Sequence, residues 1–180
     1  KRFTARYKGE WKYVHVWRKW LQWDGTRWVK DEKLAAFNRV RSFCRDVASE
    51  AELAEKLASA ATLRKATTVS AVETMDKADP GQATTLELWD SHPWLFNTLN
   101  GTVDLKTGIT YPNSKEDCIT KIAPVNSTGG LKENPVMWEK FLNDVTAGDK
   151  DLQAYLARMA GYCLTGTTGE HAIFFFYGTG

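Results

Sequence analysis

The sequence has few of the residues that bind metals or form disulfides. Its 180 residues include three cysteines and three histidines, all far apart, and no Cys-x-x-Cys pair. An odd number of widely spaced cysteines argues against both a secreted disulfide framework and a zinc ribbon. We therefore expect free thiols at Cys44, Cys118 and Cys163, a reducing cytoplasmic compartment, and no metal site.

The sequence also lacks any long apolar run. The longest unbroken apolar stretch covers residues 172–177, far short of the ~20 residues that a membrane-spanning helix requires. No basic start followed by an apolar stretch indicates a signal peptide. The 43% hydrophobic content excludes a disordered chain, and a chain of this length can bury a core. We expect a globular protein with no membrane partner.

Tryptophan, in contrast, is abundant near the start of the chain. Five of the eight tryptophans lie within residues 1–31. An Asp-Gly dipeptide at 24–25 separates two aromatic-rich segments, which predicts a two-residue hairpin turn with Trp23 facing Thr26. A third strand is expected over residues 13–17, giving a small antiparallel sheet. The side chains expected on one face of the hairpin are Leu21, Trp23 and Trp28.

Positive charge is concentrated in the same part of the chain. Residues 1–47 carry a net charge of +8, whereas residues 48–180 carry −6. Basic side chains beside exposed aromatic rings can bind single-stranded nucleic acid, because cations contact phosphates and rings stack on bases. The alternatives are that the tryptophans only bury area in a small sheet, and that both charged halves are simply solvated. The candidate nucleic-acid-binding residues are Arg18, Lys19, Trp20, Arg27 and Trp28.

The central part of the chain has a helical period. Apolar residues over 34–47 predict one helix, and a capping box at 49–52 predicts the start of a second. A third helix is expected over 69–75, and Asp-Pro-Gly at 79–81 ends the helical section. The residues expected to face inward include Leu34, Val40, Cys44, Leu53 and Leu57.

A second hairpin is predicted over residues 96–105. Asn-Gly at 100–101 supplies the positive φ values that a type I′ turn requires. Further strands are expected over 109–111 and 119–122. The side chains expected on the buried face of this hairpin are Phe96, Thr98, Val103 and Leu105.

The last part of the chain is predicted to hold two helices and a strand. The helices cover residues 135–163, with Asp149 capping the second, and the apolar strand covers residues 171–177. A buried strand that enters a glycine-rich turn is how a phosphate-binding loop begins; an ordinary strand-to-turn junction is the alternative. No catalytic residues are identified. The candidate nucleotide-binding residues are Gly178, Thr179 and Gly180.

Several segments together resemble the primase–helicases of phages and plasmids, whose corresponding domain poxvirus primase–helicases share. Residues 20–28 are similar to the W-L-x-W-D-G-x-x-W segment of that family, and residues 90–108 to its D-x-x-P-x-L-x-N-x-x-N-G-x-x-D-L-x-T-G block. Residues 119–125 resemble the segment that follows, 138–142 and 155–166 the two helices before the motor, and 174–180 the strand and opening of the Walker A loop.

The resemblance implies a helicase-associated domain within a longer protein, between a primase region and a superfamily-three helicase. This domain would help a hexameric, ATP-driven DNA helicase to assemble and to engage DNA. ATP and Mg²⁺ would be cofactors of the longer protein and none of this segment, which would not be catalytic by itself. The implied partners are DNA and further copies of the chain, in the cytoplasm of a bacterial or phage-infected cell. The alternatives are a stand-alone single-stranded DNA-binding module or an oligomerisation scaffold.

The predicted fold class is α+β, and residues 1–165 are expected to form one domain. The expected regions are a Trp-rich hairpin region (1–31), a helical region (32–78), a second hairpin region (85–125), a collar-like helical pair (134–165) and the first strand and loop of a P-loop motor (171–180).

Overall fold

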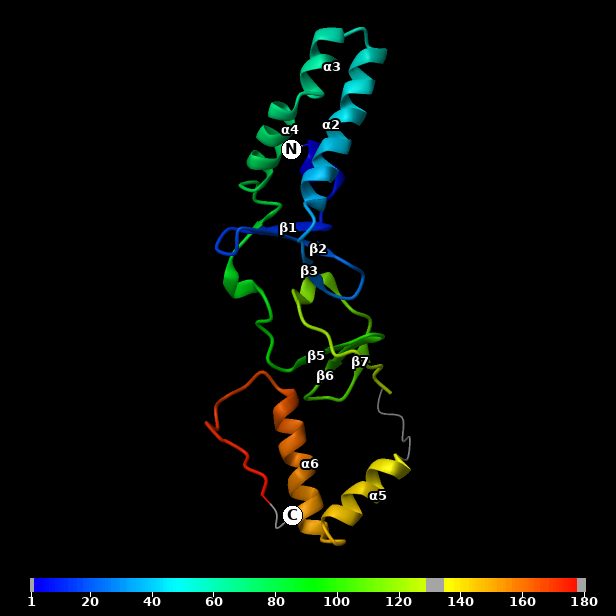
Figure 1. The fold of residues 1–180 in the computed structure, drawn as a ribbon, viewed down its shortest axis with the longest axis vertical. Helices are drawn as coiled ribbons and strands as arrows, with labels where there is room; N and C mark the ends of the chain where they lie inside the picture. The colour runs from blue at the N-terminus through cyan, green and yellow to red at the C-terminus, as the bar shows by residue number, and fades with distance from the viewer. Residues whose placement is uncertain (1, 129–134, 178–180) are drawn as a thin grey trace. The chain divides into compact units, whose positions relative to one another are not determined.

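The structure is a computed structural model that describes residues 2–128 and 135–177. It contains both helices and sheets, which confirms the α+β class (Figure 1). The chain divides into two compact units. Unit 1 comprises Lys1–Ser91 and Asn113–Ile122, and unit 2 comprises His92–Pro112 and Ala123–Gly180.

Unit 1 is built on a four-stranded sheet with the strand order β3-β2-β1-β4. Neighbouring strands pair antiparallel, except that β4 pairs parallel to β1. The strands are β1 (Trp11–Val14), β2 (Lys19–Trp23), β3 (Trp28–Lys30) and β4 (Ala83–Thr84). The α-helices are α1 (Arg2–Arg6), α2 (Ala35–Leu53), α3 (Leu57–Leu63) and α4 (Ala66–Asp76), and the short 3-10 helices are η1 (Leu86–Leu88) and η2 (Lys115–Asp117).

Both faces of this sheet are buried, because successive side chains along a strand point to opposite sides. On one face, Trp11, Tyr13 and Trp20 pack against α1, α2 and α4. On the other face, Val14, Leu21 and Trp28 pack around Trp89, with Trp23 partly buried beside them. The predicted grouping of Leu21, Trp23 and Trp28 is therefore confirmed, and the opposite face is buried as well.

The predicted two-residue turn at Asp24-Gly25 is wrong. Trp23 pairs with Trp28, so the loop holds four residues. The Asp24 carboxylate causes this difference: it accepts hydrogen bonds from the Thr26 N–H (2.7 Å), the Thr26 hydroxyl (2.7 Å) and the Arg27 N–H (2.8 Å). These bonds fold the chain into a wider loop and move every pair in the strands to a different register.

The helical section departs from its prediction at two places. Helix α2 continues through the expected capping box at 49–52 and ends at Leu53. Its start is capped from outside by the Asp31 carboxylate, which accepts hydrogen bonds from the N–H groups of Ala35 (3.0 Å) and Ala36 (2.8 Å). Leu34 has a left-handed backbone and is 74% exposed, so it does not face inward as predicted.

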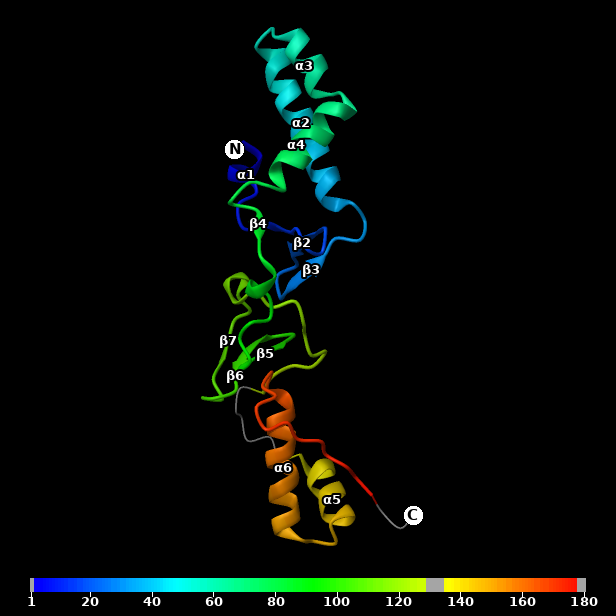
Figure 2. The same cartoon turned by 90° about the vertical axis from the view of Figure 1, so that its left-hand side faces the viewer.

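The inward faces of the helices in unit 1 are partly as predicted. Val40 and Cys44 are buried against the sheet. Leu53 and Leu57 do not face inward as predicted, since they are 89% and 68% exposed. Leu53 ends α2, and Leu57 starts α3, in which only Ala60 is buried. Helices α3 and α4 run back alongside α2 (Figures 1 and 2).

Unit 2 begins with a three-stranded antiparallel sheet in the order β5-β6-β7. Its strands are β5 (Leu95–Thr98), β6 (Gly101–Asp104) and β7 (Thr110–Tyr111). The hairpin is present, but its turn lies at Leu99-Asn100, because Thr98 pairs with Gly101. Gly101 fits this paired position since a Cβ there would lie 2.6 Å from the Tyr111 carbonyl oxygen.

The buried residues of this hairpin differ from those predicted. Thr98 is buried, but so are Asn97 and Thr102 on the other face, where the Thr102 hydroxyl donates to the Asn97 side-chain oxygen (3.0 Å). Phe96 and Val103 are only partly buried.

Residues 119–122, which belong to unit 1, do not form the predicted strand. The Ile119 carbonyl accepts a hydrogen bond from the Trp28 N–H instead (2.9 Å).

Helices α5 (Val136–Val145) and α6 (Lys150–Leu164) follow, as predicted. Asp149 caps α6 by accepting a hydrogen bond from the Leu152 N–H (3.0 Å). The strand predicted over 171–177 is absent from the described part of the chain, because no described residue pairs with that segment.

Candidate nucleic-acid interface

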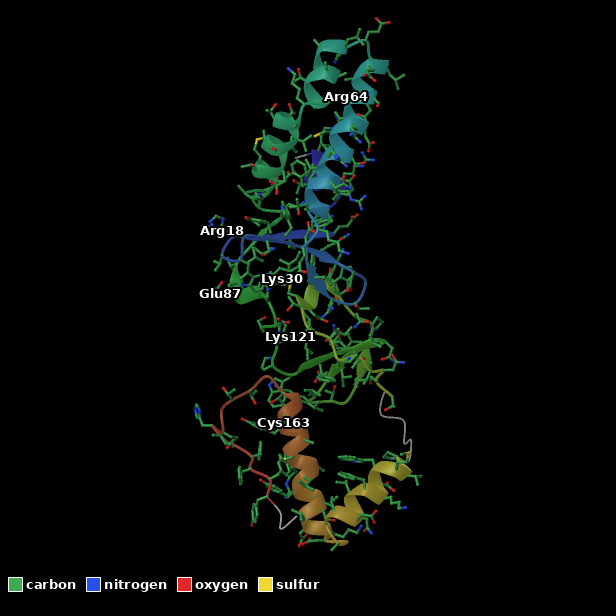
Figure 3. The ribbon with its side chains drawn as sticks, viewed as in Figure 1. Arg18, Lys30, Arg64, Glu87, Lys121 and Cys163 are labelled. Atoms are coloured by element: carbon green, nitrogen blue, oxygen red, sulfur yellow. The ribbon has the colours of Figure 1, made fainter. Side chains whose placement is uncertain are left out.

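Two of the predicted site residues lie where the chain passes from β1 to β2. Val14 pairs with Lys19, so residues 15–18 form a four-residue loop. Arg18 closes this loop with a left-handed backbone (φ 52°), and its N–H donates to the His15 carbonyl (3.0 Å). Both Arg18 and Lys19 are exposed, and Arg18 points away from the sheet (Figure 3).

Trp17 and Lys30 complete this surface. The Trp17 ring is half-buried, with its centroid 6.3 Å from that of Trp89. The exposed Lys30 ammonium lies 4.5 Å from the Trp17 centroid, within the range of a cation–π contact. Lys19 and Lys30 lie on the same face of the sheet, because Lys30 pairs with Leu21. We call Trp17, Arg18, Lys19 and Lys30 the Trp17 patch.

The carboxylate of Asp31 interacts with the charge of the patch. Burial acts to raise the pKa of Asp31, but hydrogen bonds from the N–H groups of Ala36, Ala35 and Lys33 lower it, and the charge of Lys19 adds to this effect. The carboxylate is therefore ionised at neutral pH. The oxygens of Asp31 are hydrogen-bonded to the first N–H groups of α2. The carboxylate therefore offsets part of the Lys19 charge but does not cover the patch.

Trp20 and Trp28 do not belong to this surface. Trp20 is 7% exposed and donates its indole N–H to Glu73 (2.7 Å). Trp28 is 2% exposed and donates its indole N–H to the Lys115 carbonyl (2.9 Å). Rings held in this way present no face on which a base could stack, so both tryptophans have a packing role in this structure.

Arg27 is at the other end of β2. The strand holds five residues, which separates Arg27 from Arg18 and Lys19 by about 17 Å. The Arg27 guanidinium is half-buried, with its Nε 3.8 Å from the Asp24 carboxylate. Burial acts to raise the pKa of Asp24, but hydrogen bonds from Arg27 and Thr26 lower it. The structure thus assigns Arg27 to the hairpin loop.

The candidate residues chosen from the sequence include only part of the Trp17 patch. Arg18 and Lys19 were selected from charge and spacing, whereas Trp17 and Lys30 were not. The contact between Trp17 and Lys30 depends on how the loop over residues 15–18 packs beside β3, which spacing along the sequence does not give. The signal that could have found Trp17 is its position between a buried strand and two cations.

The predicted nucleotide-binding residues Gly178, Thr179 and Gly180 lie outside the described residues. Within the described ranges 2–128 and 135–177, no group of three or more His, Cys, Asp or Glu side chains could hold a metal ion. No helix among these residues is long and apolar enough to cross a membrane.

Unit 2 carries a second notable surface, an apolar groove of about 790 Å³. It is lined by α5, α6 and residues 173–177, and Figure 1 shows the two helices diverging from the turn that joins them. Neither helix has a buried residue. On α5, the stacked rings of Trp138 and Phe141 are 54% and 51% exposed, with centroids 5.5 Å apart.

Comparison with known families identifies the chain. The family model described as D5 N terminal like matches residues 1–147. The chain therefore belongs to this family, the primase-like N-terminal domain of phage and viral primase–helicase proteins. No curated protein matches the sequence.

Proposed function

We propose that the chain is a helicase-associated domain of a phage or plasmid primase–helicase that engages single-stranded DNA through the Trp17 patch. Membership of a family found in replication proteins supports this proposal. The observation that carries it is the Trp17 ring, half-buried with three cationic side chains on or beside its loop. A partly exposed ring can stack on a base while neighbouring cations contact phosphates.

The experiment is a comparison of affinities for fluorescent oligothymidylate, measured by anisotropy. Charge reversal at Arg18 and Lys19 together should weaken binding, because two attractive contacts become repulsive. The matched control reverses Lys150 and Arg158, two exposed cations on α6. Equal affinities of the two double variants would overturn the proposed interface.

We further propose that unit 2 assembles copies of the chain through the apolar groove. The observation in favour is that α5 and α6 expose large apolar side chains along the groove, including Trp138, Phe141 and Tyr155. Monomeric proteins seldom expose continuous apolar surfaces of this kind, since burying them is favourable. This role is compatible with DNA binding by unit 1, because it uses different residues.

Sedimentation at a series of protein concentrations tests the assembly role. The chain should form oligomers, and Phe141→Ser should shift them toward monomer. The control is Leu53→Ser, which removes an exposed apolar side chain from α2 in unit 1. A chain that stays monomeric at every concentration, or a control variant that dissociates as readily, would contradict the assembly role.

For the longer protein, we propose an ATP- and Mg²⁺-dependent helicase motor whose phosphate-binding loop starts at Gly178. The coding sequence immediately after Gly180 tests this proposal. Two residues followed by Gly-Lys-Ser or Gly-Lys-Thr would complete the phosphate-binding loop, whereas unrelated sequence would exclude the motor. The 180-residue chain alone should hydrolyse no ATP, and steady Mg²⁺-dependent turnover that copurifies with it would contradict this.

A further inference from the structure

We propose that a cavity between α2 and the α3–α4 junction in unit 1 binds a phosphate group. The cavity measures about 210 Å³, and three of its seven lining residues are the arginines Arg41, Arg45 and Arg64. No acidic residue is among the described residues that line it. None of the three arginines belongs to the Trp17 patch, so this site is separate from the proposed DNA contact.

The three arginines converge from two elements. Arg41 and Arg45 are one helical turn apart on α2, and therefore project from the same side of that helix. Arg64 follows α3 directly and lies beside α2 (Figure 3). A ligand in the cavity would thus meet guanidinium groups from both walls.

The ion pairs of these side chains leave positive charge available. The Arg64 guanidinium contacts the Glu52 carboxylate (2.8 Å), and Arg41 donates to the neutral Asn38 side chain (2.6 Å). Within residues 2–128 and 135–177, Arg45 has no acidic partner within ion-pair distance. One carboxylate therefore balances three guanidinium groups, which favours an anion between them.

The start of α4 adds to this preference. Ala66, its first residue, lines the cavity. The preceding residue, Lys65, makes no side-chain cap, and the first turn holds no acid. The first N–H groups of a helix lack acceptors within the helix, and they carry the positive end of its dipole.

A purely structural role explains this cluster poorly. Like charges four residues apart on a helix destabilise it, so placing Arg41 and Arg45 on one face weakens α2 unless an anion separates them. Both side chains are exposed and contribute little to the core. An anionic ligand would turn this repulsion into two charge-assisted contacts.

The size of the cavity limits the ligand to one anionic group. Pockets for whole small molecules start at roughly 300 Å³, so a complete nucleotide does not fit inside. Guanidinium groups match the paired oxygens of a phosphate in geometry as well as in charge. Either a backbone phosphate of a nucleic acid or a free phosphate monoester supplies this chemistry.

The test is a titration of the ¹⁵N-labelled chain with inorganic phosphate, followed by NMR. Saturable shifts are expected at the backbone amides of Ala66 and Thr67, with matched chloride as the reference salt. Arg45→Gln should raise the dissociation constant about tenfold, since it removes one charge-assisted contact. Arg158→Gln on α6 removes an equal charge elsewhere and should leave it unchanged.

A second arm of the titration separates the two phosphate sources. Oligothymidylate that shifts the same amides would identify a nucleic-acid backbone phosphate, and shifts caused by inorganic phosphate alone would identify a free monoester. Shifts that never saturate, or that are equal in Arg45→Gln and the parent chain, would overturn the site. Such a failure would leave the Trp17 patch unaffected, because Arg18→Glu and Lys19→Glu test it with other residues.

Discussion

The Trp20 indole N–H donates a 2.7 Å hydrogen bond to the Glu73 carboxylate and so joins β2 to α4. The second oxygen of Glu73 pairs with the Lys77 ammonium at 2.7 Å. This arrangement fixes Trp20 between the sheet and the helices, with its ring centroid 5.1 Å from that of Tyr13. A tryptophan that the sequence suggested for DNA contact is thus part of the core.

Trp20→Phe should destabilise the chain without changing its affinity for DNA. The variant removes the indole N–H that donates to the partly buried Glu73 carboxylate, which costs about 1.5–3 kcal/mol for a hydrogen bond to a charged group. Urea unfolding measures the stability, and anisotropy with oligothymidylate measures the binding. A loss of DNA affinity at unchanged stability would show that Trp20 contacts DNA, and would contradict its assignment to the core.

Asp24→Ala should destabilise the first hairpin by about 1.5–3 kcal/mol, because one carboxylate accepts three hydrogen bonds in the loop. Asp24→Asn keeps a side-chain oxygen acceptor and should lose less. Urea unfolding of both variants gives the comparison. Equal losses for Ala and Asn would show that the loop does not depend on these bonds.

The hairpins illustrate how far the sequence predicts this fold. The turn residues located both hairpins, because Asp-Gly and Asn-Gly between apolar segments are strong hairpin signals. The register of the paired strands, however, depends on the hydrogen bonds and close contacts that form in and beside each loop. Three bonds to Asp24 widen the first loop, and the pairing of Thr98 with Gly101 places Gly101 within β6. Neither contact can be predicted from local spacing.

The candidate site was predictable to the same extent. Charge near the start of the chain indicated the loop with Arg18 and Lys19, because composition alone carries that signal. Trp17 and Lys30 meet only after the strands pair. The burial of Trp20 and Trp28 depends on packing against α4 and Trp89, which are distant in sequence.

Gly101→Ala should destabilise the sheet of unit 2 by about 1–3 kcal/mol, the usual cost of forcing extra atoms into a packed site. The added Cβ would lie 2.6 Å from the Tyr111 carbonyl oxygen, so β7 must move. Gly161→Ala is the control, since its Cβ meets nothing within 4 Å and it lies in α6. Thermal unfolding should separate the two; a Gly101→Ala chain as stable as the control would contradict the packing.

Asp76→Asn should flatten part of the pH dependence of stability. Burial raises the pKa of Asp76 to about 6, and the Asp79 and Glu73 carboxylates add to the shift. Because the folded-state pKa is raised, the stabilising contribution of Asp76 is complete below its unfolded pKa and is lost as the pH rises through about 6. The variant should therefore gain stability relative to the parent chain as the pH rises from about 4 to 7.

The size of this gain follows from the shift in pKa. It should reach at most about 3 kcal/mol, at 1.36 kcal/mol per pKa unit. Urea unfolding at both ends of the pH range measures it, with the exposed Glu32→Gln as a control. A difference between variant and parent that stays constant with pH would show that Asp76 titrates normally.

The salt dependence of DNA binding tests the central claim most directly. Each phosphate neutralised on a single strand contributes about −0.7 to the slope of log K against log salt concentration. Replacing Arg18 and Lys19 by Gln should therefore make the slope less negative by about 1.4. An unchanged slope would place the phosphate contacts on another surface and contradict the Trp17 patch as the DNA-binding site.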